Sequence, residues 1–467
     1  MVQFKFTLFI LLLMGSAQVY SQSSQNEKVE TETDPVILAK LEQWKNLKFG
    51  LLMHWGTYSQ WGIVESWSLC SEDEDWCRRK MKNYADYCRE YTRLKNTFNP
   101  MKFDPVRWAA AAKYAGMKYV IFTTKHHDGF CMFDTKQTDY SITDVNCPFH
   151  TNPKANVTKE IFNAFRAQGF WTGAYFSKPD WHCNDYWAEE WATPNRNVNY
   201  SVKKYLQRWQ KYCDFTFNQI KELMTGYGKL DILWLDGGWV DPKNGQDINM
   251  PKIATMARSH QPDLLIVDRT VTGKYENYRT PEQEIPDKLL DYPWETCMTM
   301  ASSWSYVPGD IYKPTNKIIH LLVEIVCKGG NFLLNIGPSP EGEWADTAYL
   351  RLREIGDWMK INGEAIYNSR PVEPFKSGNF CFTVNPEGSV YIIYLAGSGE
   401  TMMNDSYVVK GYQPSPGSEI SILGSSGFLK WKKESEGIRI EIPARLRKKP
   451  PCRHAWTFKI QKNNTIR

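Results

Sequence analysis

Several features that mark other protein classes are missing from this 467-residue sequence. No block of Lys and Arg interleaved with aromatic residues occurs, and a net charge of +5 is modest for this length, so we do not expect nucleic-acid binding. No glycine-rich phosphate loop follows a predicted strand, which disfavours a nucleotide-binding open sheet. The eleven cysteines show no metal-ligand spacing. After the amino-terminal segment, no apolar run is long enough to cross a membrane, so membrane insertion is not expected.

The amino-terminal segment, residues 1–21, has the pattern of a secretory signal peptide. Lys5 supplies a positive charge, residues 6–14 are apolar but too short to span a bilayer, and residues 19–21 fit a cleavage site. The mature chain is expected to begin near Gln22, with a flexible polar leader over residues 22–33. We therefore expect a secreted or periplasmic protein, or a lysosomal one if the host is eukaryotic.

Aromatic residues are abundant: 19 Trp, 25 Tyr and 22 Phe make up 14% of the chain. A large core accounts for part of this content. Aromatic faces also stack on the apolar faces of sugar rings, so the same content is consistent with carbohydrate binding.

Strands alternate with helices through the first part of the chain. Short apolar runs are predicted as strands at residues 49–53, 119–123, 172–176, 232–236, 264–267 and 331–338, with amphipathic helices between them. Alternation of this kind predicts a parallel sheet, and residues 34–370 are expected to form a (β/α)8-like, TIM-type barrel. From residue 371 to 467 the helical period is lost, and short alternating strands predict an antiparallel β-sandwich.

Asp236 ends one predicted strand, directly before Gly237 and Gly238. An aspartate before glycine often caps a turn. A carboxylate among aromatic residues at the carboxyl end of a barrel strand is also where a TIM-type barrel places catalytic groups. This stretch by itself leaves both interpretations open.

Three of the eight histidines, His54, His126 and His127, lie just past two predicted strands. The adjacent pair His126 and His127, together with Asp128, could bind zinc. Neighbouring residues on a strand face opposite sides, however, which disfavours joint ligation by His126 and His127. Hydrogen bonding to sugar hydroxyls is the better hypothesis, because imidazole both donates and accepts.

Other charged residues complete a possible site. Arg269 ends a strand and could keep a neighbouring carboxylate ionised, although a surface ion pair is the plainer interpretation. Glu295 lies beside Trp294, and an apolar setting raises a carboxyl pKa as a general acid requires. Glu282 is the rival acid, but charged neighbours suggest a solvated or salt-bridged side chain there. Tyr175 is expected near the mouth of its strand, in the core or against substrate.

Six motifs together resemble the α-L-fucosidases of glycoside hydrolase family twenty-nine. They are Lys48-Phe49-Gly50 after Trp44, His54-Trp55-Gly56, residues 125–130 (KHHDGF), residues 234–237 (WLDG), residues 335–338 (NIGP) and residues 363–367 (GEAIY). The resemblance runs in order along essentially the whole mature chain. It is similar to the bacterial branch of that family.

The resemblance implies a catalytic barrel followed by a β-sandwich, no cofactor and no catalytic metal. It also implies retaining hydrolysis of terminal α-L-fucosides on oligosaccharides or glycoconjugates, through a covalent fucosyl-enzyme. The family's nucleophile corresponds to Asp236, and Glu295 is our predicted acid/base. The predicted substrate-binding residues are His54, Glu65, Trp67, His126, His127, Tyr175, Arg269 and Trp304.

Two alternatives stay open at this point. The chain could be a catalytically weak fucose-binding relative, or a metal-dependent hydrolase that uses the histidines. The sequence does not indicate an oligomeric state or a natural linkage.

Overall fold

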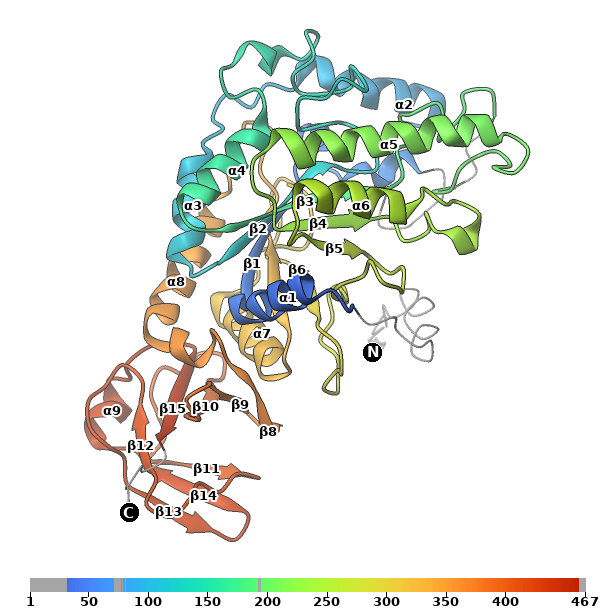
Figure 1. The fold of residues 1–467 in the computed structure, drawn as a ribbon. Coiled ribbons are helices and arrows are strands. Elements are labelled where there is room, and N and C mark those ends of the chain that lie inside the picture. Colours follow the sequence, from blue (N-terminus) through green and yellow to red (C-terminus); the bar gives the residue numbers. More distant parts are fainter. Residues whose placement is uncertain (1–31, 71–76, 78, 80, 192–194, 462–467) are drawn as a thin grey trace, which may run out of the picture.

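The computed structural model describes residues 32–70, 77, 79, 81–191 and 195–461. The predicted signal peptide and most of the predicted leader lie outside these residues. Figure 1 shows two parts: a curled sheet surrounded by helices, and a smaller all-β part at the carboxyl end beyond α8. No helix among the described residues combines the length and apolarity needed to span a bilayer.

The larger part is built on seven parallel strands in the order β5-β4-β3-β2-β1-β7-β6. The strands are β1 (Phe49–Met53), β2 (Tyr119–Lys125), β3 (Trp171–Ser177), β4 (Ile232–Asp236), β5 (Leu265–Asp268), β6 (Glu295–Thr299) and β7 (Asn331–Asn335). Nearly all of their residues are buried, because helices cover one face and the barrel interior covers the other. The prediction of a (β/α)8-like fold is confirmed, with seven regular strands.

The eighth position of the barrel is filled by an irregular segment, residues 275–283. Its backbone bonds to β5 on one side, where Asn277 N donates to Ile266 O at 2.9 Å. On the other side Glu295 N donates to Arg279 O at 2.8 Å, and Gln283 N donates to Cys297 O at 3.0 Å. The segment therefore closes the gap between β5 and β6 without forming a ladder of its own.

Helices pack outside the sheet and one closes its base. They are α1 (Pro35–Leu47), α2 (Tyr84–Arg93), α3 (Pro105–Tyr114), α4 (Val157–Ala167), α5 (Leu206–Gly226), α6 (Met250–His260), α7 (Thr315–Cys327) and α8 (Asp346–Asn362). Asp34 caps α1 by accepting from Val36 N. Ile37, Leu41 and Trp44 of α1 join the core inside the barrel at its amino-terminal end. Because α1 closes the amino-terminal end of the barrel, only the carboxyl-terminal end can admit a ligand.

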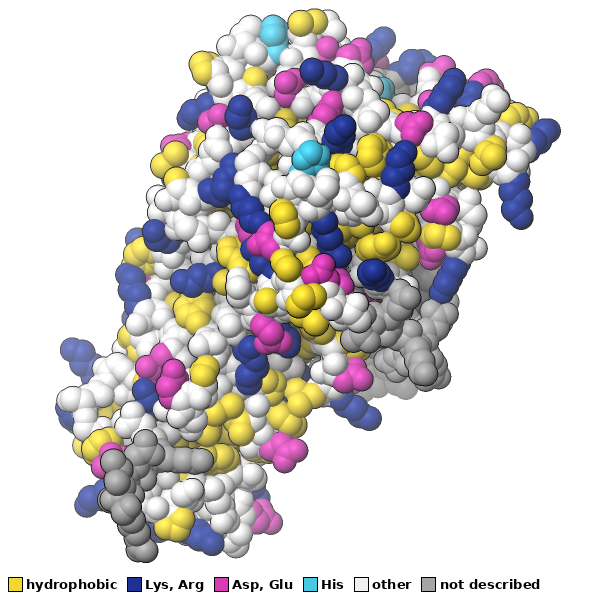
Figure 2. All heavy atoms as spheres, in the orientation of Figure 1, with side chains coloured by type: hydrophobic (Ala, Val, Ile, Leu, Met, Phe, Trp, Pro, Cys, Tyr) yellow, Lys and Arg dark blue, Asp and Glu magenta, His cyan; other side chains and the backbone are white. Residues whose placement is uncertain are grey.

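The carboxyl-terminal part holds two antiparallel sheets with a shared core. Their strands are β8 (Arg370–Ser377), β9 (Phe380–Val384), β10 (Val390–Leu395), β11 (Ser406–Lys410), β12 (Glu419–Ile422), β13 (Trp431–Glu434), β14 (Gly437–Glu441) and β15 (Ala455–Gln461), with the short helix α9 (Ala444–Lys448) before β15. The β-sandwich prediction is confirmed. β8 begins at Arg370, next to the predicted boundary at residue 371. On the face drawn in Figure 2, basic and acidic side chains are interspersed over both parts.

Candidate active site

Asp236 is the last residue of β4, at the carboxyl-terminal edge of the sheet. Its Oδ1 accepts from Arg269 Nη1 at 3.0 Å, and its Oδ2 accepts from the Tyr175 hydroxyl at 2.6 Å. Arg269 follows β5, and Tyr175 points inward from β3. β3, β4 and β5 thus hold the Asp236 carboxylate at the carboxyl-terminal mouth of the barrel.

The ionisation of Asp236 is set by these two partners. Burial acts to raise the pKa of this carboxyl, but the Arg269 charge and the Tyr175 hydrogen bond outweigh it and hold the pKa well below its usual range. Asp236 is therefore an anion at neutral pH, as a nucleophile must be.

The three predicted histidines converge on this carboxylate. His127 Nε2 lies 3.9 Å from Asp236 Oδ2, and the ring centroids of His126 and His127 are 4.3 Å apart. His54 lies 5.5 Å from His126 and is fixed by Asn335 Oδ1, 2.8 Å from its Nδ1. The expectation that His126 and His127 face opposite sides is wrong. β2 ends at Lys125, so both rings leave a turn in which strand alternation does not apply.

Burial keeps all three rings neutral at pH 7. It lowers the pKa of His54 and of His127 to about 4 each, and that of His126 well below its ordinary value. A neutral imidazole offers one donor and one acceptor, which matches a sugar hydroxyl. His126 Nδ1 is already bonded to the Ser66 hydroxyl, so its other nitrogen is the one that faces the site.

His126, His127 and Asp236 also form a potential metal-binding group among the described residues, with ligand atoms within 4.8 Å of one another. Both oxygens of Asp236 already accept hydrogen bonds, one of them from a guanidinium. A cation at this point would lie against the positive charge of Arg269. The donor set therefore fits a hydrogen-bonded anion better than a metal ligand.

Aromatic side chains line one side of the site. The Trp67 ring lies 5.3 Å from His127, and Trp239 lies 5.1 Å from His127 and 5.8 Å from Trp67. Across the site, Trp304 lies 5.2 Å from His54, and its carbonyl accepts from Asn335 Nδ2 at 2.6 Å. The predicted positions of Trp67, Trp304 and Tyr175 all belong to this one cluster. Trp239 and Asn335 also belong to it, although they were not predicted as site residues; both lie at or just after strand ends.

Glu65 is buried at the same edge. Its Oε1 accepts from Ser305 N at 2.9 Å, and burial raises its pKa to about 8. It is therefore protonated at neutral pH and can donate a hydrogen bond. The charge of Glu282 raises the pKa of Glu65 further.

Glu282 shares Arg269 with the nucleophile candidate. Arg269 Nη1 binds Asp236, Nη2 binds Glu282, and Nε donates to Thr280 Oγ1 at 3.2 Å. The Glu282 side chain is 42% exposed, so it can reach a molecule bound at the mouth. One guanidinium thus holds two carboxylates side by side.

Glu295 is not at this site, which contradicts its predicted role as acid/base. It is the first residue of β6 and pairs with Asn331, the first residue of β7, so it lies at the amino-terminal edge of the sheet. Its side chain is fully buried, and Oε2 accepts from the Tyr119 hydroxyl at 2.5 Å. Burial raises its pKa to about 8, as the apolar sequence around it suggested, but no leaving group can reach it there.

Comparison with known proteins identifies this arrangement. Residues 16–364 match the family model "Alpha-L-fucosidase", and residues 376–461 match "Alpha-L-fucosidase C-terminal domain". The mouse tissue alpha-L-fucosidase is 28% identical over 443 residues, covering 89% of this chain and 91% of its own. The structure of alpha-L-fucosidase isoenzyme 1 from Paenibacillus thiaminolyticus superposes with a TM-score of 0.72 at 28% identity, over 91% of this chain and 99% of that chain. The structure of Thermotoga maritima alpha-fucosidase in complex with fucose superposes with a TM-score of 0.71 at 25% sequence identity. The match covers 90% of this chain and 96% of that chain.

The chain belongs to the α-L-fucosidase family. The predictions of family, of glycoside hydrolase activity and of fold are therefore confirmed. These comparisons do not assign roles to single residues of the site.

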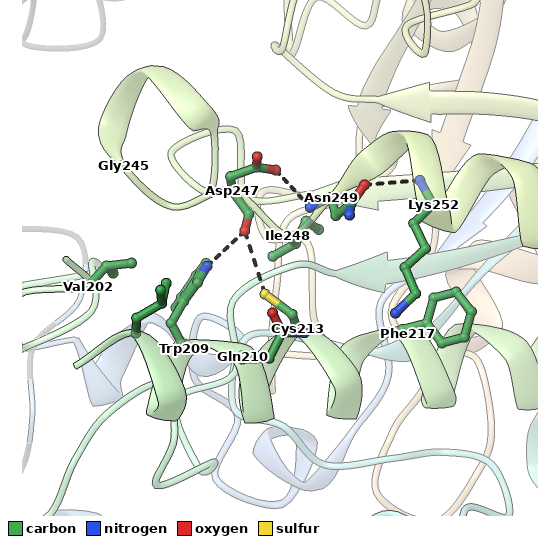
Figure 3. Close-up of a pocket in the computed structure, with 11 residues that line it drawn as sticks. Val202, Trp209, Gln210, Cys213, Phe217, Gly245, Asp247, Ile248, Asn249 and Lys252 are labelled. Carbon is green, nitrogen blue, oxygen red and sulfur yellow. Dashed lines mark hydrogen bonds between the residues drawn. The ribbon is translucent and has the colours of Figure 1, made fainter. Parts of the chain in front are cut away.

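A separate groove of the fucosidase lies away from this site. A groove of about 270 Å³ runs between α5 and residues 245–252, where Trp209 Nε1 and Cys213 Sγ both approach the Asp247 carbonyl (Figure 3). None of the residues that line it belongs to the Asp236 site. The groove therefore plays no part in assigning the reaction.

Proposed function

We propose that this protein is an exo-acting, retaining α-L-fucosidase that removes terminal α-L-fucosyl residues from oligosaccharides or glycoconjugates. The observation that carries the proposal is the ionised Asp236, held by Arg269 and Tyr175 beside a second carboxylate. Retaining glycosidases need two carboxyl groups about 5 Å apart. Asp236 and Glu282, bound to the two terminal nitrogens of one guanidinium, are the pair that we assign to these roles.

In the first step, Asp236 attacks C1 of the fucosyl group and forms an ester while the glycosidic C–O bond breaks. Arg269 and Tyr175 orient the attacking oxygen and keep it unprotonated. The leaving oxygen takes a proton from the acid. In the second step, the acid residue, now a base, takes a proton from water; the water oxygen attacks C1, the ester bond to Asp236 breaks, and the Asp236 carboxylate is released with fucose in the α configuration.

We assign the acid/base role to Glu282 in place of Glu295. Glu282 is the partly exposed carboxylate next to Arg269, whereas Glu295 is sealed at the barrel base. Glu65 is the remaining carboxyl at the site, and we assign it to hydrogen bonding with a sugar hydroxyl, because it is buried and protonated.

The histidines and tryptophans bind the sugar. His54, His126 and His127 present neutral nitrogens to hydroxyl groups, and Trp67 and Trp304 offer apolar surface to the fucose ring and its methyl group. The described residues that we assign to the monosaccharide pocket all belong to the barrel part.

The expected place of action is outside the cytoplasm. This proposal rests on the signal-like segment at residues 1–21 and stays a prediction. Analysis of the mature amino terminus after expression with secretion machinery would test it, with cleavage before Gln22 as the expected result.

The reaction is tested by following an aryl α-L-fucoside with NMR. The first fucose released should be the α-anomer, and Asp236→Ala should be at least ~1000-fold slower because the covalent route is lost. Asp214→Ala, at an exposed position on α5, is the control and should keep normal turnover. Initial release of the β-anomer, or near-normal activity of folded Asp236→Ala, would overturn the proposal.

A further inference from the structure

Besides the Arg269–Asp236 pair, a buried ion pair between Lys178 and Asp268 lies next to the backbone of Asp236. Lys178 follows β3 and is completely buried, and its Nζ donates to Asp268 Oδ1 at 2.5 Å and to Val240 O at 2.9 Å. Asp268 is the last residue of β5 and is also buried. Neither side chain contacts the sugar site, so the catalytic steps above leave both unused.

These contacts join the ends of three consecutive strands. Lys178 N donates to Asp236 O at 2.8 Å, which ties β3 to the end of β4. Its ammonium group then reaches the loop after β4 at Val240 and the end of β5 at Asp268. Asp268 directly precedes Arg269, whose own N donates to Leu235 O at 3.1 Å. Lys178 thus contacts both the backbone of Asp236 and Asp268, the residue directly before Arg269.

Close packing shows how little space these strand ends have. Gly237 has φ +90°, and a Cβ placed on it would lie 2.3 Å from Pro179 Cδ. A Cβ on Gly238 would lie 1.8 Å from Thr270 Oγ1. The turn after Asp236 is therefore pressed between the residues that follow Lys178 and those that follow Asp268.

Stability alone is a weak reason for such a pair. Desolvating two charges can cost as much as their attraction returns, and buried ion pairs can often be replaced by neutral groups of similar size without loss of stability. A pair that binds one backbone carbonyl and two strand ends has a geometric effect that a neutral replacement lacks.

We propose that the Lys178–Asp268 pair is a positioning device that holds Asp236 in register with Arg269 by locking the ends of β3, β4 and β5 together. The proposal rests on the proposed function, because it takes Asp236 as the nucleophile. Lys178 and Asp268 are positioning residues that act through Asp236, Arg269 and the Trp239 loop. A misplacement of about 1 Å at a reacting group costs on the order of 100-fold in rate.

The test compares a double variant with a matched control. Lys178→Met leaves Asp268 buried without its partner and should lower the Tm. Lys178→Met/Asp268→Asn removes both charges and should recover most of that loss. Lys40→Met/Asp231→Asn removes another buried pair, whose Nζ–Oδ1 distance is 2.6 Å, at the opposite end of β4. Both double variants are measured in the full chain with an aryl α-L-fucoside.

We expect the Lys178→Met/Asp268→Asn variant to lose about 10- to 100-fold in kcat, with less than about threefold change in the inhibition constant of fucose. Its acidic limb of kcat/KM should move to higher pH, because a displaced Arg269 stabilises the Asp236 anion less. The groups facing Asp236 that contribute to this profile are Arg269, Tyr175, His126 and His127. The Lys40→Met/Asp231→Asn control should show neither change.

The outcomes separate the two proposals. If the Lys178→Met/Asp268→Asn variant recovers its Tm and also shows wild-type kcat and pH profile, the pair is only structural and the inference is wrong. If its kcat falls but the control variant falls equally, the effect is general destabilisation and the inference is again wrong. If Asp236→Ala itself stays active, the proposed function fails first.

Discussion

The guanidinium of Arg269 lies 3.0 Å from Oδ1 of Asp236 and is the main source of that carboxylate's low pKa. The opposing effect is burial, which would raise the same pKa if the guanidinium were absent. The balance between these two effects makes the site sensitive to one substitution.

Arg269→Met should move the acidic limb of kcat/KM to higher pH. Asp236 must be ionised to attack, and without Arg269 burial dominates and raises its pKa, so activity is lost at a higher pH as the solution is acidified. The pH profile with an aryl fucoside measures this. Arg258→Met is the control, since Arg258 pairs with Glu32 at 3.2 Å, away from the site. An unmoved acidic limb would mean that Arg269 does not control Asp236.

The identity of the acid is tested by leaving-group dependence. Glu282→Ala should slow natural fucosides by about 100-fold or more and activated aryl fucosides much less, because only poor leaving groups need protonation. Azide should restore its rate and give fucosyl azide of retained configuration. Glu284→Ala, at an exposed neighbouring position, should behave as wild type.

Glu65→Ala is the decisive comparison for that assignment. We expect it to raise KM, because a buried donor to the sugar is lost, and to show no azide rescue. Rescue of Glu65→Ala in place of Glu282→Ala would transfer the acid/base role to Glu65.

Glu295→Gln should change stability with pH and leave kcat within about twofold. The pKa of Glu295 is about 8 in the folded protein and 4.5 for the free side chain, so the folded state holds the proton more tightly. The stability this provides is complete below about pH 4.5 and is lost as the pH rises through about 8. Gln cannot ionise, so the Tm of the variant minus that of the wild type should increase over this range.

Exposed Glu341→Gln is the control for that measurement and should give a Tm difference that does not vary with pH. If Glu295→Gln is inactive and azide restores its activity, Glu295 is the acid/base after all.

His126→Ala and His127→Ala should each weaken fucose binding about tenfold or more, because a buried hydroxyl partner is lost. A chelator should leave wild-type activity unchanged. The inhibition constant of fucose and a metal analysis of the purified protein measure the two effects. His150→Ala, a half-buried residue outside the site, is the control. Stoichiometric zinc whose removal abolishes activity would support a metal-dependent hydrolase.

Glu295 shows where sequence reasoning reached its limit. Its neighbours Trp294 and Cys297 correctly predicted an apolar environment and a raised pKa. They could not predict the end of the barrel at which the side chain lies. That depends on β6, a strand that the sequence did not reveal, beginning at Glu295 itself.

For Glu282 the sequence predicted an ion pair but not the partner. Its charged neighbours in sequence suggested a salt-bridged loop residue, and it is indeed paired, but with Arg269 across the mouth. The pairing arises because residues 275–283 fill the eighth position of the barrel and bring Glu282 to the edge where β4 and β5 end.

The sequence by itself determined the family, the alternation of strands and helices, the sandwich, and the strand-end positions of Asp236, His54 and Arg269. These follow from local patterns: hydrophobic periodicity, turn residues and motifs that span a few positions. Only the tertiary structure decided which carboxyl lies beside Asp236, that His126 and His127 face the same space, and that Lys178 reaches Asp268. These depend on how strands far apart in the chain meet around a closed barrel, and a contact between two such strands leaves no trace in the residues next to either partner.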